Sequence, residues 1–318
     1  MRLIDAPAAA LGWLGRQGTR AVAVSVFAGI LLPPLATLLR PLFTAALIAL
    51  LCLTFLRVDP AALRRQFARP RVILAGSLWM MLAMPLLFGG ALVLLDVRGV
   101  EEALFLALIL QAVAPPIISA PALAALMGLD AALSLATLIV CMTVTPFVAP
   151  AYAALFAGAE LTISPLALGL KLFAMLAGSA LAAALVRRIA GAPWVERQRE
   201  RIDGLNVIAL FIFAVALMDG VAANMLARPL LVLGLTALAF ALTAALTVVT
   251  ALVMLPAGRP AAFALALASG SRNMGLMLAA TGGAVPELTW LYFAIAQFPI
   301  YLMPQILKPL ARRVHIGQ

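Results

Sequence analysis

Charged residues are scarce in this sequence. Only 11% of the 318 residues are Asp, Glu, Lys or Arg, and 65% are hydrophobic. A soluble domain carries about 25% charged residues, because polar side chains must cover its surface. The shortage of polar sequence therefore excludes a soluble helical fold. We expect an integral membrane protein surrounded by the lipid bilayer.

Cysteine and histidine are almost absent as well. Cys52 and Cys141 each lie inside an apolar run, and the single histidine, His315, lies in a basic tail. Metal centres and many catalytic sites need clusters of these side chains. The sequence also contains no HExxH zinc motif and no nucleophile elbow. We therefore expect no metal site and no enzymatic activity.

Apolar runs near 20 residues long recur along most of the chain. A helix of that length crosses a hydrocarbon core of about 30 Å. We predict an all-α integral membrane fold of ten transmembrane helices, forming one domain over residues 1–318. The predicted spans cover residues 21–39, 41–56, 72–95, 103–127, 131–156, 164–186, 204–225, 229–255, 261–281 and 288–307.

Basic residues are concentrated on one side of these spans. Only Arg40, Arg98 and Arg228 fall on the other side, while Lys171 and Arg272 lie inside spans. Lys and Arg gather in cytoplasmic loops, so both termini are predicted to be cytoplasmic, as expected for a bacterial inner membrane. The net charge of +10 then reflects topology, and no nucleic-acid partner is expected. The other 17 of the 22 basic residues are Arg2, Arg16, Arg20, Arg57, Arg64, Arg65, Arg69, Arg71, Arg187, Arg188, Arg197, Arg199, Arg201, Arg259, Lys308, Arg312 and Arg313.

Two of the predicted spans are interrupted near their centres. The fourth carries Pro115 and Pro116, and proline removes a backbone donor and clashes with the preceding turn. The ninth carries Gly270 and Gly275 on either side of Ser271. Backbone groups freed in this way must face protein or water, because lipid cannot satisfy them.

Each interrupted span is the fourth of a five-span half. Halves with an odd number of spans are inverted relative to each other, so we predict two inverted repeats, about residues 21–156 and 164–310. Paired broken helices that cross in mid-membrane are typical of secondary-transporter sites. Proline and glycine also kink ordinary membrane helices, which is the alternative for either span taken alone.

Arg272 is the most informative residue, because it lies at the centre of an apolar span. A guanidinium at that depth costs about 2.5–3.5 kcal/mol on insertion scales. It therefore needs an internal partner, a water-filled cavity or a function. We expect it to belong to a site where the two broken spans cross.

Three stretches resemble the bile acid:sodium symporter family. Residues 270–276 (Gly-Ser-Arg-Asn-Met-Gly-Leu) have the frame of the family's Gly-x-Gln-Asn-x-Gly-Leu. Residues 115–121 stand at its Pro-Gly-Gly break, and residues 129–134 are similar to its Gly-Asp-x-Ala-Leu-Ser. With ten spans, the resemblance covers nearly the whole chain. It implies a panel and a core domain, with the broken spans crossing and sodium ions bound nearby.

The sequence departs from this family where ion ligands are expected. The family's glutamate position is Ala268, its glutamine position is Arg272, and its paired polar position in the fourth span is Ala120-Pro121. Only Ser134 keeps a hydroxyl among the positions that align. We predict that sodium is absent and that Arg272 stands in for the cation. Its expected partners are the unwound carbonyls of residues 115–119 and the amide of Asn273.

These observations predict a secondary transporter that moves a small organic or amphipathic anion by alternating access, without sodium. The guanidinium and the N-termini of half-helices are expected to attract the anion. The candidate site residues are Arg272, Asn273, Ser271, Ser269, Pro115, Pro116, Ser119, Ser134 and Gln297.

Two further charges leave alternatives open. Asp219 is either a proton-coupling group, a partner for Arg272 or Lys171, or a hydrated residue near the interface. Lys171 is either a coupling residue or a side chain that extends to the interface. The alternative functions are a proton-coupled carrier or uniporter of another metabolite, and a transporter-like receptor without transport.

Overall fold

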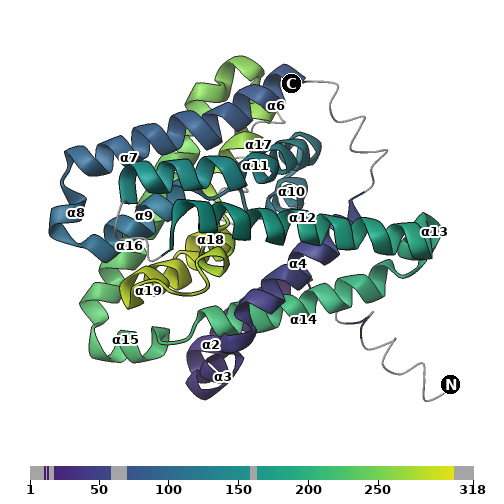
Figure 1. Ribbon diagram of the computed structural model, residues 1–318, viewed down its shortest axis with the longest axis horizontal. Helices are drawn as coiled ribbons and strands as arrows, with labels where there is room; N and C mark the ends of the chain where they lie inside the picture. The colour runs from purple at the N-terminus through teal and green to yellow at the C-terminus, as the bar shows by residue number, and fades with distance from the viewer. Residues whose placement is uncertain (1–10, 12, 14–17, 59–69, 158–162, 304–318) are drawn as a thin grey trace. The chain divides into compact units, whose positions relative to one another are not determined.

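The computed structural model describes residues 11, 13, 18–58, 70–157 and 163–303, and its regular elements there are all helices (Figure 1). The predicted cytoplasmic termini and His315 lie outside the described residues. Among those described, six segments are long and apolar enough to cross a membrane. The protein is therefore an all-α integral membrane protein. The six segments are Pro33–Arg57, Pro70–Leu94, Ala131–Phe156, Pro165–Ala190, Arg199–Ala227 and Pro229–Ala257.

The chain forms two compact units, and the first comprises Met1–Asp59 and Phe173–Pro229. Within it, α14 packs along α2, α3 and α4, and the rings of Phe43 and Phe213 stack with their centroids 5.0 Å apart. Arg57 Nε lies 3.0 Å from Asp203 Oδ1. Its elements are α2 (Gly18–Leu31), α3 (Pro33–Leu39), η1 (Arg40–Leu42), α4 (Phe43–Arg57), the later part of α12 (Pro165–Ala190), α13 (Ala192–Arg197), α14 (Arg199–Leu217) and α15 (Val221–Ala227).

The helix boundaries in this unit differ from two predicted spans. The predicted span 21–39 is divided at Leu32, whose φ of −122° and ψ of 68° are not helical. The following Pro33 explains the break, because proline disfavours a helical conformation in the residue before it. The predicted span 204–225 is likewise divided, at Gly220, which has a φ of +80°. Only glycine adopts that conformation without strain.

The second unit comprises Pro60–Leu172 and Leu230–Gln318. Within it, α9 packs against α7, α11 and α19, while α11 also contacts α6, α10 and α17. Its elements are α6 (Pro70–Leu78), η2 (Trp79–Ala83), α7 (Met84–Leu94), α8 (Val97–Val100), α9 (Glu102–Val113), α10 (Ala120–Leu126), α11 (Ala131–Tyr152), η3 (Ala153–Ala157), the start of α12, α16 (Pro229–Met254), η5 (Leu255–Ala257), α17 (Arg259–Gly270), α18 (Met274–Ala280) and α19 (Glu287–Ile295).

Both predicted helix interruptions are present in this unit. The first break (residues 114–119) separates α9 from α10, and the second break (residues 271–273) separates α17 from α18. The expectation for Gly275 was wrong, because this residue lies inside α18. Gly270 has a packing reason to be glycine. An added Cβ would collide with Thr247 Oγ1 and lie 3.0 Å from the Thr243 carbonyl oxygen.

Candidate functional site

The two breaks lie side by side, joined by an isolated antiparallel bridge between Pro116 and Arg272. The Ile117 amide donates a hydrogen bond to the Ser271 carbonyl at 2.7 Å, and the Asn273 amide donates to the Pro115 carbonyl at 2.8 Å. Backbone groups released by unwinding therefore satisfy one another, as a membrane interior requires. We call this pairing, residues 114–117 and 271–273, the junction.

Local sequence explains why helices resume beyond the junction. The Asn273 side chain accepts from the Leu276 amide at 3.1 Å and so caps the start of α18. Pro121 lies at the second position of α10, where no intrahelical bond needs its missing amide. Both breaks are therefore short and bounded.

Arg272 is completely buried, with 0% of its surface exposed. Its Nε donates to the Ser269 carbonyl at 2.9 Å, and its Nη1 donates to the carbonyls of Ala114 at 2.9 Å and Met80 at 3.2 Å. Its Nη2 lies 2.7 Å from Met84 Sδ. The planar fork of donors thus reaches both breaks and a third segment of the chain.

Two of the three carbonyls that bind Arg272 have lost their helical donors at the breaks. In a continuous helix, Ser269 would accept from the amide four residues later. That amide belongs to Asn273, which donates to Pro115 instead. The donor for Ala114 would be residue 118, which lies in the unwound first break. The guanidinium replaces both lost donors.

The third carbonyl, that of Met80, is freed by a change of helical register. In the π-helical turn η2, the Met84 amide donates to Trp79, five residues back. The same register would next pair Pro85 with Met80, but proline has no amide hydrogen. Met80 is therefore left to accept from Arg272. Such π turns frequently occur at functional sites.

A hydrogen-bond chain extends from the sulfur of Met84. The Ser269 hydroxyl lies 4.0 Å from Met84 Sδ, and the Thr250 hydroxyl donates to Ser269 Oγ at 2.8 Å. The Trp79 indole then donates to Thr250 at 3.0 Å. One network therefore connects η2, α7, α16 and α17 with Arg272.

Carbonyl dipoles favour positive charge at this position. α9 and α17 both end at the junction, where their C-termini carry partial negative charge, whereas α18 begins there. The hydrogen-bond acceptors of Arg272 in the described part of the chain are neutral carbonyl and thioether groups. Its charge is therefore stabilised by dipoles. The same dipoles would suit a small metal cation.

Two side chains at or next to the junction offer no ligand to a sodium ion. Ala268 is buried and has no side-chain oxygen. Arg272 offers five donors and no lone pair. A second cation a few ångströms from it would be repelled, by about 4 kcal/mol at 4 Å and an effective dielectric constant of 20.

Other predicted site residues lie in the same unit with different partners. Ser119 Oγ, Ser134 Oγ and Asn273 Nδ2 are buried and lack hydrogen-bond partners among the described residues. They keep capacity to bind a polar ligand or water. Gln297 is buried, but its Nε2 donates to the Phe293 carbonyl, four residues earlier in α19, at 3.1 Å.

The partners of Arg272 were not those expected from the sequence. The guanidinium binds the carbonyl of Ala114, just before the expected range 115–119, and the Asn273 side chain caps a helix instead. Sequence reasoning missed Met80 and Met84. The available signal was Pro85, whose missing amide implies a free carbonyl within the preceding turn.

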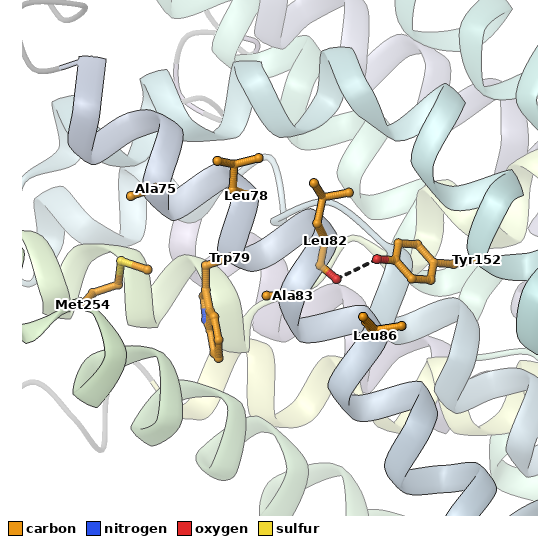
Figure 2. A pocket seen from close by; sticks show the side chains of 8 residues that line it. All are labelled: Ala75, Leu78, Trp79, Leu82, Ala83, Leu86, Tyr152 and Met254. Atoms are coloured by element: carbon orange, nitrogen blue, oxygen red, sulfur yellow. Dashed lines mark hydrogen bonds between the residues drawn. The ribbon is translucent and has the colours of Figure 1, made fainter.

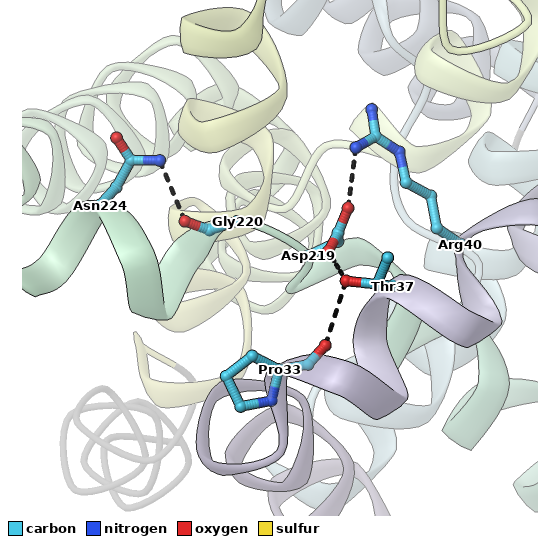
Figure 3. A network of polar contacts seen from close by, with 6 residues as sticks. All are labelled: Pro33, Thr37, Arg40, Asp219, Gly220 and Asn224. Carbon is cyan, nitrogen blue, oxygen red and sulfur yellow. Dashed lines mark hydrogen bonds and ion pairs between the residues drawn. The ribbon is translucent and has the colours of Figure 1, made fainter.

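Asp219 lies in the first unit and has its own partners (Figure 3). Its Oδ2 lies 2.7 Å from Arg40 Nη1, and its Oδ1 accepts from Thr37 at 2.7 Å. The predicted pairings with Arg272 or Lys171 are therefore replaced by one with Arg40. Lys171 is exposed, and its Nζ lies near Gly282, 3.5 Å from where a Cβ on that residue would be.

Comparison with known proteins gives a match to one family. The model of the sodium bile acid symporter family matches residues 44–228, more than half of the chain. The matched region includes the first break and ends before the second. No curated protein matches the chain. The apolar helices and the break within the matched region are consistent with this match. The chain belongs to the sodium bile acid symporter family.

Proposed function

We propose that this protein is a sodium-independent secondary transporter that moves a small organic or amphipathic anion by alternating access. The supporting observation is the buried guanidinium of Arg272, bonded to carbonyls from both broken spans. We further propose ten spans in two inverted repeats within a single domain, in a bacterial inner membrane with both termini cytoplasmic. The repeats would cover about residues 21–156 and 164–310.

In this proposal, Arg272 takes the structural role of a bound cation. A metal ion at the junction would bridge oxygens from both broken helices. The guanidinium bridges Ser269, Ala114 and Met80 in the same way. Unlike a metal ion, it is attached to the chain and always charged.

The proposed substrate is an anion because the charge of Arg272 has neutral hydrogen-bond acceptors in the described part of the chain. A charge in a low-dielectric interior acts over several ångströms. Direct contact with substrate is not required, and in this conformation the guanidinium is fully buried. Among the described residues, Ser119 and Asn273 of the same two broken spans supply free hydrogen-bonding groups.

A sodium titration tests the proposal without knowledge of the substrate. Purified protein is heated in NaCl, KCl or choline chloride at equal ionic strength, and the unfolding temperature is recorded. We expect the same temperature in all three salts. A saturable increase with Na⁺ alone would refute sodium independence, because a ligand that binds the folded state raises its stability.

Transport itself is tested in liposomes. Organic anions that shift the unfolding temperature are first identified, and the best one is then used in counterflow with sodium replaced by choline. We expect unchanged counterflow. A strict sodium requirement contradicts the proposal, and absence of counterflow for every binding anion favours the receptor alternative. Counterflow that needs a pH gradient favours the proton-coupled alternative.

A further inference from the structure

An apolar groove runs along the second unit, outside the junction (Figure 2). Figure 2 shows its lining residues in a row along α6, η2 and α7, with Met254 near one end and Tyr152 near the other. The groove has a volume of about 440 Å³. It is lined by Ala75, Leu78, Trp79, Leu82, Ala83, Leu86, Tyr152 and Met254.

Side-chain size along one helix face explains the shape of the groove. Leu78, Leu82 and Leu86 recur every four residues and are 54%, 41% and 51% exposed. Ala75 and Ala83 leave space beside this ridge because their side chains are short. The groove is therefore part of the helix surface itself.

The polar groups in the groove wall are already paired. The Trp79 indole donates to Thr250 at 3.0 Å, and the Tyr152 hydroxyl donates to the Leu82 carbonyl at 2.7 Å. A polar ligand would have to be desolvated without gaining these bonds. The wall therefore suits a hydrocarbon occupant.

The position of the groove agrees with a hydrocarbon occupant. Leu82 is the central residue of the candidate span Pro70–Leu94. From Ala75 to Leu86 the helix rises about 16 Å, at about 1.5 Å per residue. With Leu82 at the centre of a hydrocarbon core of about 30 Å, the groove crosses the midplane, and its longer part, from Ala75 to Leu82, lies in one leaflet. Lipid headgroups do not reach this position.

The groove is open along its outer side. A single acyl chain, which is narrower than a helix of about 10–12 Å, can lie along it within the bilayer.

We propose that this groove binds one acyl chain of a bilayer phospholipid, lying along α6, η2 and α7 with its methylenes against Trp79. The site does not depend on the proposed transport function. It does connect to the junction, because the Trp79 indole belongs to the hydrogen-bond chain that ends at Met84 and Arg272.

Native mass spectrometry of the full chain tests the proposal. Protein from phosphatidylcholine nanodiscs is stripped with increasing detergent, and retained lipids are counted for wild type, Ala83→Phe and Ala241→Phe. Ala83→Phe fills the groove, whereas Ala241 lies exposed on α16 outside it. We expect wild type and Ala241→Phe to retain one phosphatidylcholine that Ala83→Phe loses. Equal counts for all three, or a dimer that dissociates only in Ala83→Phe, would overturn the proposal.

Fluorescence quenching gives a second readout, which stands even if Ala83→Phe fails to fold. Trp13, Trp194 and Trp290 are replaced by Phe, leaving Trp79 as the only tryptophan. Phosphatidylcholine brominated at mid-chain is compared with the same lipid brominated next to the ester. Because Trp79 lies near mid-membrane, bulk lipid alone would favour the mid-chain bromines, so both lipids are titrated into the protein in detergent. We expect quenching of Trp79 by the mid-chain bromines that saturates at one lipid per protein. Quenching that rises in proportion to lipid without saturating would overturn the proposal, and neither measurement requires transport activity.

Discussion

Arg272 Nη1 lies 2.9 Å from the carbonyl oxygen of Ala114, which is 158 residues earlier in the chain. One side chain thereby satisfies a carbonyl exposed by the first break while its own backbone forms part of the second break. The junction therefore depends on a charged group that a membrane protein would otherwise exclude from its interior. Five predictions follow from this arrangement and from the ion pairs of the first unit.

Replacing Arg272 should destabilise the second unit in a graded order. Arg272→Met leaves three buried carbonyls without donors, and each such group costs about 1–3 kcal/mol. Arg272→Lys keeps the charge but loses the planar fork, so we expect intermediate stability. Unfolding in denaturant, followed by circular dichroism, ranks the variants. A methionine variant as stable as wild type would contradict the role assigned to the guanidinium.

The double substitution Ala268→Glu with Arg272→Gln restores the two family residues at these positions. We expect this variant to be stabilised by Na⁺ over K⁺, because a carboxylate and an amide oxygen then replace a cation. Thermal unfolding in matched salts measures the effect. The single variant Arg272→Gln is the control and should respond weakly, since it lacks the carboxylate. No sodium response in the double variant would count against the proposed exchange of cation for guanidinium.

Gly270→Ala should weaken the packing of α17 against α16. The new Cβ meets Thr247 Oγ1 and the backbone carbonyl of Thr243, and overpacking of this kind costs about 1–3 kcal/mol. Gly234→Ala is the matched control, because no atom lies within 4 Å of a Cβ there. It should be neutral or stabilising, since alanine favours helix over glycine. Denaturant midpoints that fall equally in both variants would disprove the packing argument.

Arg40 and Asp219 should be energetically coupled. The two side chains are 50% and 12% exposed, and partly exposed pairs of this kind contribute about 0.2–1 kcal/mol. A double-mutant cycle with Arg40→Gln and Asp219→Asn measures the coupling. The control cycle pairs Arg40→Gln with Asp203→Asn, whose partner is Arg57. Coupling should appear in the first cycle and be absent from the second.

Asp219→Asn should leave the pH dependence of counterflow unchanged. The carboxylate is bound by Arg40 and Thr37 within the first unit, which favours a structural role over a proton-carrying one. Counterflow is measured between pH 5 and pH 8 for wild type and variant. A pH profile that flattens only in the variant would instead support the proton-coupled carrier.

The breaks could be predicted from sequence because their residues act locally. Pro115 and Pro116 remove backbone donors wherever they lie, and a lone arginine in an apolar span demands internal partners. The identity of those partners depends on contacts across the chain. Met80 accepts from Arg272 only because η2 adopts a π register ahead of Pro85, and packing decides that register.

The partner of Asp219 shows the same limit. Arg40 lies 179 residues away in sequence. Charged side chains of these types are also common in hydrated loops, so the sequence does not show that the two residues pair. Leu32 is a different case, because the proline that follows it was visible in the sequence. The apolar run 21–39 concealed that boundary, since hydropathy does not report backbone geometry.

A tethered cation has a consequence for the energy source of transport. An ion that dissociates on the far side of the membrane delivers the work stored in its gradient, whereas the guanidinium of Arg272 never leaves the chain. Under the proposed function, a monovalent anion crosses alone and experiences the full membrane voltage, worth about 2.3 kcal/mol per 100 mV. Since the cytoplasm is electrically negative, this voltage favours outward movement of the anion, and import would require an opposing concentration gradient.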